Sequence, residues 1–100
     1  MKVYKLCSIS NLGTRVSWAA FGRDVVEYEM GKYVTANEGR NPALFVFKNK
    51  KTAMRVLNAV HYGRLYLAAA KEATVKPKNA NLIPPGTLYF KKVKLVRRIK

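Results

Sequence analysis

Alternation of apolar and polar side chains predicts β-strands at the start of the chain. Val3, Cys7 and Ile9 share one parity, which is typical of a strand over residues 2–9 with one buried face. An Asn-Leu-Gly turn at residues 11–13 separates this strand from a second apolar run over residues 16–21. The two segments therefore form a predicted hairpin.

The pattern continues with a third and a fourth strand. A Gly-Arg-Asp turn precedes a strand over residues 25–30, in which Glu27 and Glu29 mark a solvent-exposed face. The polar stretch 35–42 has the length and composition of a surface loop. The continuously apolar run 43–47 is short, and it predicts a buried strand rather than a helix.

One amphipathic helix is predicted over residues 50–62. Asn49 precedes it as a candidate N-cap, and Gly63 follows it with the conformational freedom that ends a helix. Its apolar face has helical spacing and consists of Ala53, Val56, Leu57 and Val60.

The last part of the chain predicts two more strands joined by a loop. Residues 64–70 are apolar on both parities, which indicates a strand with substantial burial, whereas the Pro- and Asn-rich segment 74–86 is typical of a long loop. The strand over residues 87–99 changes its apolar parity, so we expect a β-bulge near Lys91 and Lys92. The parity passes from Leu88 and Phe90 to Val93, Leu95 and Ile99.

Together these elements predict an α+β fold. We expect a mostly antiparallel sheet of five or six strands with one amphipathic helix packed on one face. One hundred residues suffice for a single domain over residues 1–100, and 49% hydrophobic content with 11% aromatic residues argues against disorder. No apolar run has the length of a membrane span or of a secretory leader, and the single Cys7 cannot form an internal disulfide, so we expect a cytoplasmic protein.

Charge adds the main functional clue. The chain has 20 Lys and Arg against 5 Asp and Glu, a net charge of +15. Residues 51–100 hold twelve basic side chains and one acid, a net +11, whereas residues 1–50 hold eight and four, a net +4. Such an asymmetric positive field attracts polyanions.

The start of the predicted helix is one candidate anion site. Its basic and hydroxyl residues are Lys48, Lys50, Lys51 and Thr52. Lysines are unfavourable in the first helical turn, because the free backbone N–H groups there already carry partial positive charge. A bound phosphate would accept hydrogen bonds from these N–H groups and neutralise the lysines. The alternative is that these lysines are simply solvated.

The final strand is the second candidate. It carries six basic residues: Lys91, Lys92, Lys94, Arg97, Arg98 and Lys100. If the register continues past the bulge, four of them (Lys92, Lys94, Arg98 and Lys100) share the face opposite the apolar residues. Charges two residues apart on a strand lie about 6.8 Å from each other, a spacing that can follow a phosphate backbone. The alternative is an edge strand that lysines protect from aggregation.

Aromatic residues near basic groups are candidate stacking platforms for bases. They are Tyr33, Tyr62, Tyr66 and Tyr89. Trp18 is better interpreted as a buried anchor of the second strand. The closely spaced aromatic and glycine signature of RNA-recognition sheets is missing.

The sequence offers little for catalysis, and we expect no enzyme and no cofactor. His61 is the only histidine, and no acid or nucleophile stands beside it in the sequence. Glu27 and Glu29 share a strand face with the spacing of solvated residues, and Asp24, Glu38 and Glu72 add no metal-ligand spacing to them.

The order of elements resembles a loose class of small uncharacterised α+β proteins from bacteriophage and prokaryotic genomes. The resemblance rests on Val26-Glu27-Tyr28-Glu29-Met30-Gly31-Lys32, on Leu44-Phe45-Val46-Phe47 and on the helix and apolar strand that follow. It covers residues 1–75. It implies a viral or accessory protein that acts through a partner, in the host cytoplasm if viral, and it implies no activity or site residue.

Two functions from different classes follow. The first is a nucleic-acid-binding module that grips the phosphate backbone of DNA or RNA, with little sequence readout, through the last strand and the helix start. The second is a small basic inhibitor or adaptor that docks on an acidic host-protein surface.

Overall fold

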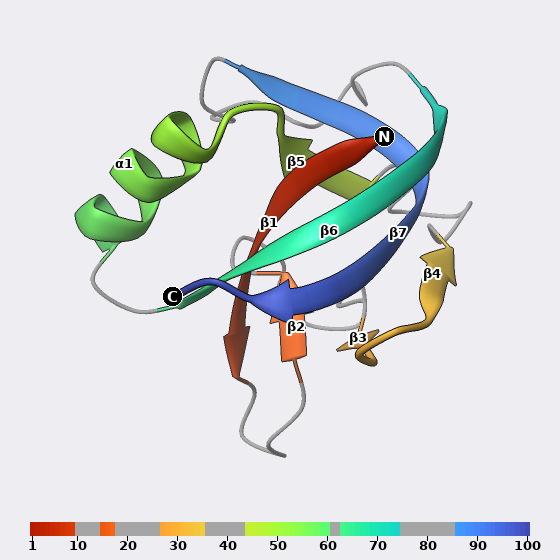
Figure 1. Ribbon diagram of the computed structural model, residues 1–100, viewed down its shortest axis with the longest axis horizontal. Helices are drawn as coiled ribbons and strands as arrows, with labels where there is room; N and C mark the ends of the chain where they lie inside the picture. Colours follow the sequence, from red (N-terminus) through yellow and green to blue (C-terminus); the bar gives the residue numbers. More distant parts are fainter. Residues whose placement is uncertain (10–14, 18–26, 36–43, 61–62, 75–85) are drawn as a thin grey trace.

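The alternating segments of the chain form strands that pair antiparallel. The computed structural model describes residues 1–9, 15–17, 27–35, 44–60, 63–74 and 86–100. In chain order its elements are β1 (Lys2–Ile9), β2 (Arg15–Ser17), β3 (Glu27–Tyr28), β4 (Tyr33–Thr35), β5 (Leu44–Phe47), α1 (Lys50–Val60), β6 (Arg64–Ala73) and β7 (Thr87–Arg98) (Figure 1).

Four of the strands close into a small barrel. β1 pairs with β6, β6 with β7, and β7 with β5, and β5 returns to β1 through the single pair of Tyr4 and Phe47. Three short strands extend this ring: β2 lies on β1, β3 on β2, and β4 on β7. The predicted α+β fold with one helix is confirmed. The described residues contain seven strands rather than five or six, because three of them have only two or three residues.

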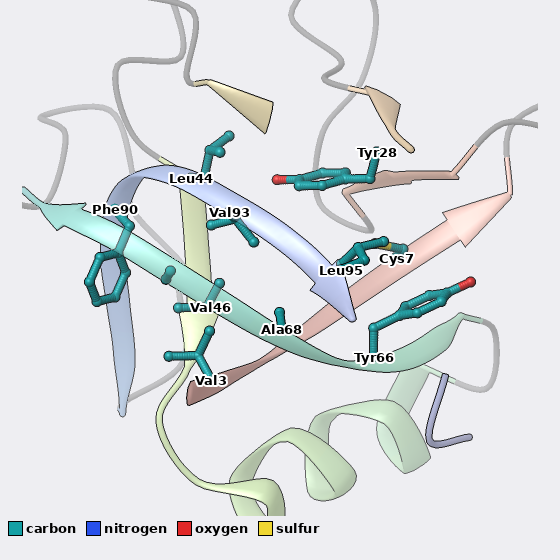
Figure 2. Packing of buried hydrophobic residues seen from close by; sticks show 11 residues of the cluster. Val3, Cys7, Tyr28, Leu44, Val46, Tyr66, Ala68, Phe90, Val93 and Leu95 are labelled. Carbon is teal, nitrogen blue, oxygen red and sulfur yellow. The ribbon is translucent and has the colours of Figure 1, made fainter. Parts of the chain in front are cut away.

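The inside of the barrel holds the larger hydrophobic core. Figure 2 shows Val93 and Leu95 of β7 gathered with side chains from the surrounding strands. The buried members are Val3, Cys7, Tyr28, Leu44, Val46, Tyr66, Ala68, Ala70, Phe90, Val93 and Leu95. Such a core joins residues that are far apart in the sequence, so it holds the ring closed.

A second core lies between α1 and the outer surface of the barrel. Ala53 and Leu57 of the helix pack there against Leu6, Phe47 and Leu65 of three strands. Asn49 stands at the predicted N-cap position, since its carbonyl accepts a hydrogen bond from the Ala53 N–H at 3.1 Å. Gly63 has a φ of +122°, a conformation that favours glycine, but residues 61–62 lie outside the described ranges, so its part in ending the helix stays a prediction.

Several predicted segments are confirmed within the described residues, and one strand was missed. β1, β5, β6 and β7 lie where the pattern predicted them, and Tyr28 is buried beside the exposed Glu27. Ile9, which the parity placed with Val3 and Cys7, is 41% exposed. The sequence pattern did not indicate β4, whose three residues follow the turn at Gly31.

Other predictions fall on residues outside the described ranges. These are the turns at 11–13 and 22–24, the ends of the second and third strands at 18–21 and 25–26, the loops at 36–42 and 75–85, Ala43, and the helix end at 61–62.

The last strand changes parity as predicted, but its register shift lies elsewhere. Phe90 and Val93 are both buried, so the apolar parity does change across Lys91 and Lys92. The ladder to β6 slips further on: Ala68 is opposite Leu95 and Leu67 is opposite Arg97, which leaves Val96 as the extra residue. Because of this slip, Ile99 does not join Val93 and Leu95 inside the barrel.

Ile99 packs instead against the second core, and its N–H donates to the Leu65 carbonyl at 2.7 Å. The prediction that one parity carries Val93, Leu95 and Ile99 is therefore wrong. The physical reason is that an inserted residue moves every following side chain to the other face of the sheet.

Candidate nucleic-acid interface

The outer face of β7 carries a row of cations between two neighbouring strands. Lys92 is opposite Lys71 of β6 on one side and Thr35 of β4 on the other, and Lys94 is opposite Ala69 and Tyr33. Since Val93 and Leu95 point into the barrel, Lys92 and Lys94 point outward. β4, β7 and β6 thus form a three-stranded surface with cations along its middle strand.

The register slip at Val96 changes which arginine joins this row. Arg97 is opposite Leu67, on the outer parity of β6, whereas Arg98 is opposite Tyr66, whose ring lies in the barrel core. Arg97 therefore shares a face with Lys92 and Lys94. An unshifted register would place Arg98, not Arg97, on this face, as the sequence pattern predicts. That prediction is wrong, because the extra residue Val96 exchanges the faces of all residues that follow it, as it does for Ile99.

Two of the cations lie over the ring of Tyr33. The Lys71 ammonium lies 4.1 Å from the centroid of this ring, and the Lys94 ammonium lies 4.9 Å from it. Tyr33 is 40% exposed. An ammonium at this distance is attracted by the negative face of an aromatic ring, so Tyr33 holds two lysines close together at the surface. We call this surface the tyrosine–lysine patch; its residues are Tyr33, Lys71, Lys92, Lys94 and Arg97.

Within the patch, Lys71 and Lys92 form a cross-strand pair of like charges. Directly opposed like charges destabilise a sheet. Glu72 partly compensates, because its carboxylate lies 2.9 Å from the Lys92 ammonium, and the hydrogen bond from Lys92 lowers the pKa of Glu72. Glu72 also has a φ of +62°, which is uncommon for any residue but glycine.

Arg98 and Lys100 of the basic C-terminal strand make their contacts away from the patch, whereas Lys91 lies at its edge. Lys91 is exposed, and its charge helps to lower the pKa of the Glu72 carboxyl. The Arg98 Nε donates to the Lys100 carbonyl at 3.3 Å, and the Lys100 N–H donates to the carbonyl of Leu65, at the start of β6. Of the four residues expected to share one face, Lys92 and Lys94 do so, whereas Arg98 does not. The structure places Lys92, Lys94 and Arg97 together and adds Lys71.

The predicted site at the helix start is a separate region. Lys48, Lys50 and Lys51 are exposed, and the first turn of α1 holds no acidic residue. Thr52 lies at the N-terminal end of β7, since a Cβ on Gly86 would lie 3.6 Å from its Cγ2. In Figure 1, α1 and β4 lie at opposite sides of the molecule, so the helix start and the patch do not form one surface.

Among the described residues one basic side chain is buried, and the sequence pattern did not indicate it. Lys5 is 1% exposed, although it shares its parity with Val3 and Cys7. Its ammonium donates to the Phe45 carbonyl at 2.7 Å and lies 3.9 Å from the Phe45 ring centroid. On one edge, β1 pairs with β5 at Tyr4 and with β2 from Cys7 onward. Lys5 therefore lies between the position where β1 pairs with β5 and the positions where it pairs with β2.

Burial lowers the pKa of Lys5 from its usual 10.5 to about 8. The Tyr28 ring lies 5.3 Å from the ammonium, and burial raises the pKa of the Tyr28 hydroxyl, which has no hydrogen-bond partner in the described structure. Lys5 is thus a structural cation that does not contribute to the outer surface.

The remaining candidate residues add no second site. Tyr66 is buried and Tyr89 is half-buried, whereas Tyr62, Trp18, His61, Asp24 and Glu38 lie outside the described residues. Glu29 pairs with Lys32 at 3.2 Å. In the described part of the chain, no three His, Cys, Asp or Glu side chains gather as a metal-ligand set, and no helix is long and apolar enough to cross a bilayer.

Comparisons of the chain with protein-family models, with curated proteins and with solved structures found no match.

Sequence reasoning found part of the patch. It named Lys92, Lys94 and Arg97 as basic residues of the last strand and Tyr33 as one of four aromatic candidates. It missed Lys71, because the contact between residues 33, 71 and 94 depends on pairing across three strands. The available signal was that Lys71 is the first charged residue after the apolar run of β6.

Proposed function

We propose that the protein binds nucleic acid through the phosphate backbone, with little sequence readout, and that the tyrosine–lysine patch is its contact surface. The observation that carries this proposal is that Lys71 and Lys94 lie against one exposed aromatic ring, with Arg97 further along the same outer face of the sheet. Phosphates are the ligands that neutralise such a group of cations, and phosphate contacts do not depend on the base sequence.

Charge repulsion supports the proposal. The pairing of Lys71 with Lys92 has a cost in the free protein, and the whole chain carries a net charge of +15. Bound phosphates would relieve both the local and the overall repulsion. Lys92 and Lys94 are two residues apart on β7, a spacing of about 6.8 Å, so these two cations can contact successive phosphates of one strand.

The test is the salt dependence of binding in two charge-matched variants. One variant changes three patch residues, Lys71, Lys94 and Arg97, to Gln. The control changes Lys48, Lys50 and Lys51 at the helix start to Gln, so both variants lose three positive charges. Binding to a fluorescent oligonucleotide is measured by anisotropy over a range of salt concentrations.

We expect the patch variant to flatten the plot of log K against log salt concentration by about 2, because each phosphate contact on a single strand contributes about 0.7 to the slope. The helix-start control should keep a slope close to that of the wild type. Equal slopes in wild type and patch variant would contradict the proposed surface. Loss of slope in the control alone would assign the contact to the helix start.

A second candidate function is docking on an acidic protein surface. The observation in its favour is Val96, which is 48% exposed beside Arg97, because an exposed apolar side chain next to cations is typical of a protein contact. Co-purification after nuclease treatment separates the two functions. A stoichiometric protein partner that survives nuclease, and that the patch variant loses, would support docking on a protein.

A further inference from the structure

Tyr33 is an exposed aromatic residue within the patch. Its ring favours single-stranded over double-stranded nucleic acid as the ligand. We infer that the protein binds single-stranded nucleic acid, with one unpaired base stacked on Tyr33 and the adjoining phosphates held by Lys71 and Lys94. This inference rests on the proposed function and deepens it.

The ring is mounted on a fixed support. β4 pairs with β7 over three positions, Val34 packs against the barrel core, and the Gly31 N–H donates to the Leu95 carbonyl at 2.9 Å just before the strand. A ring on a paired strand loses little further freedom when a ligand binds, so stacking has a low entropic cost.

The residues around Lys94 leave its side chain room to move. Lys94 stands between Tyr33 of β4 and Ala69 of β6, and the side chain of Ala69 is only a methyl group. Both lysines beside the ring have flexible stems, so their ammonium groups can swing from the ring to a phosphate. A base can then take the place of an ammonium on the ring face.

A single strand and a duplex differ in how much of this surface they can use. Every nucleotide of a single strand carries a base and a phosphate joined through one sugar, so one nucleotide can contact the ring and a lysine together. In a duplex the bases are stacked inside, and only the phosphates can reach the patch. The stacking contribution is therefore available to single strands alone.

The experiment compares two ligands and two variants. The ligands are a short oligothymidylate and an abasic strand of the same length, which has the phosphates but lacks the bases. The variants are Tyr33→Leu, which removes the ring, and Tyr33→Phe, which keeps it. Affinities are measured by anisotropy competition at one salt concentration, and the salt slope is measured for each pair.

We expect the wild type to bind oligothymidylate about 5- to 150-fold more tightly than the abasic strand, the range typical of one stacked base. Tyr33→Leu should remove most of this preference and leave the salt slope unchanged, and Tyr33→Phe should retain the preference. A wild type that binds both strands equally, with a normal salt slope, would overturn the inference and leave the proposed function standing.

The wild-type comparison does not require a folded variant, so instability of Tyr33→Leu cannot hide the answer. A preference that Tyr33→Leu keeps in full would also overturn the inference, because the base would then stack elsewhere. If no strand bound in a salt-dependent manner, the proposed function itself would fail.

Discussion

The tyrosine–lysine patch and the helix start contain similar numbers of cations, but the two regions differ in how the cations are arranged. At the helix start, Lys48, Lys50 and Lys51 are neighbours in the sequence, and each is exposed. In the patch, Lys71 and Lys94 come from different strands and share one ring. In the patch, one aromatic ring attracts two ammonium groups from different strands, whereas the three lysines of the helix start project into solvent. The local density of lysines in the sequence therefore does not show which cations of different strands lie close together.

The largest expected difference between the patch and the helix start in oligonucleotide binding comes from reversing one charge in each region. Lys94→Glu should weaken oligonucleotide binding about 10- to 100-fold, because a charge-assisted contact is worth about 1.5–3 kcal/mol and the new carboxylate repels phosphate. Lys51→Glu changes the net charge equally and should weaken binding far less. Similar losses in both variants would mean that the overall field, rather than the patch, attracts the ligand.

The buried Lys5 tests whether the effect of a cation on stability and on oligonucleotide binding depends on its position rather than on its contribution to the net charge. Its folded pKa of about 8 lies below its unfolded value of 10.5, so below pH 8 burial of the charged amine lowers stability. As the pH rises from 8 to 10, the folded protein loses this proton first, and the free energy of unfolding should increase by about 2 kcal/mol. The gain should stop near pH 10, since the raised pKa of Tyr28 lowers stability above that pH.

Lys5→Met should abolish this rise while leaving oligonucleotide affinity unchanged, because Lys5 does not reach the patch. Lys2→Gln, which removes an exposed charge from the same strand, is the matched control and should keep the rise. Urea unfolding at a series of pH values measures both. A rise that persists in Lys5→Met would show that another group is responsible.

A smaller effect is expected from the unfavourable lysine charges beside the free N–H groups at the helix start. Lys50→Glu places a carboxylate in the first turn of α1, where it interacts with free N–H groups, and should stabilise the protein by about 0.5 kcal/mol at low salt. Lys2→Glu makes the same charge change on β1 and should give a smaller gain. Denaturation at two salt concentrations checks this, and an unchanged or lowered stability of Lys50→Glu would contradict the charge–dipole argument.

The smallest expected change concerns Glu72, which under the proposed function would compete with phosphate for Lys92. Glu72→Gln removes the ion pair of 2.9 Å and should increase oligonucleotide affinity about 2-fold. Glu29→Gln breaks a similarly exposed ion pair with Lys32 outside the patch, and serves as the control. If both variants gained equally, the effect would come from net charge rather than from the release of Lys92.

The fold was largely predictable because its elements have strong local signals. The spacing from Ala53 to Leu57, with Asn49 before and Gly63 after, predicts the helix, and alternation predicts the long strands. β4 escaped because three residues are too few for a periodic pattern. Lys5 escaped because a charged residue at an inward position is assigned to a surface unless its partners are known, and its partner Phe45 is forty residues away.

The candidate site was predictable only in part. The excess of basic residues after residue 50 is visible in the chain, and so are Lys92, Lys94 and Arg97 as members of one strand. Their common face is not visible, because it depends on one extra residue at Val96 in the ladder to β6. A shift of one residue exchanges Arg98 for Arg97 and moves Ile99 from one core to the other.

The sequence by itself determined the helix, the long strands, the α+β class and the surplus of positive charge, since each follows from the order of neighbouring residues. Only the tertiary structure decided that four strands close into a barrel, that Lys5 lies inside it, and that Tyr33, Lys71 and Lys94 meet on its outer face. Periodicity is a property of a short segment, whereas closure and register depend on which distant strands pair and on the core that their pairing buries.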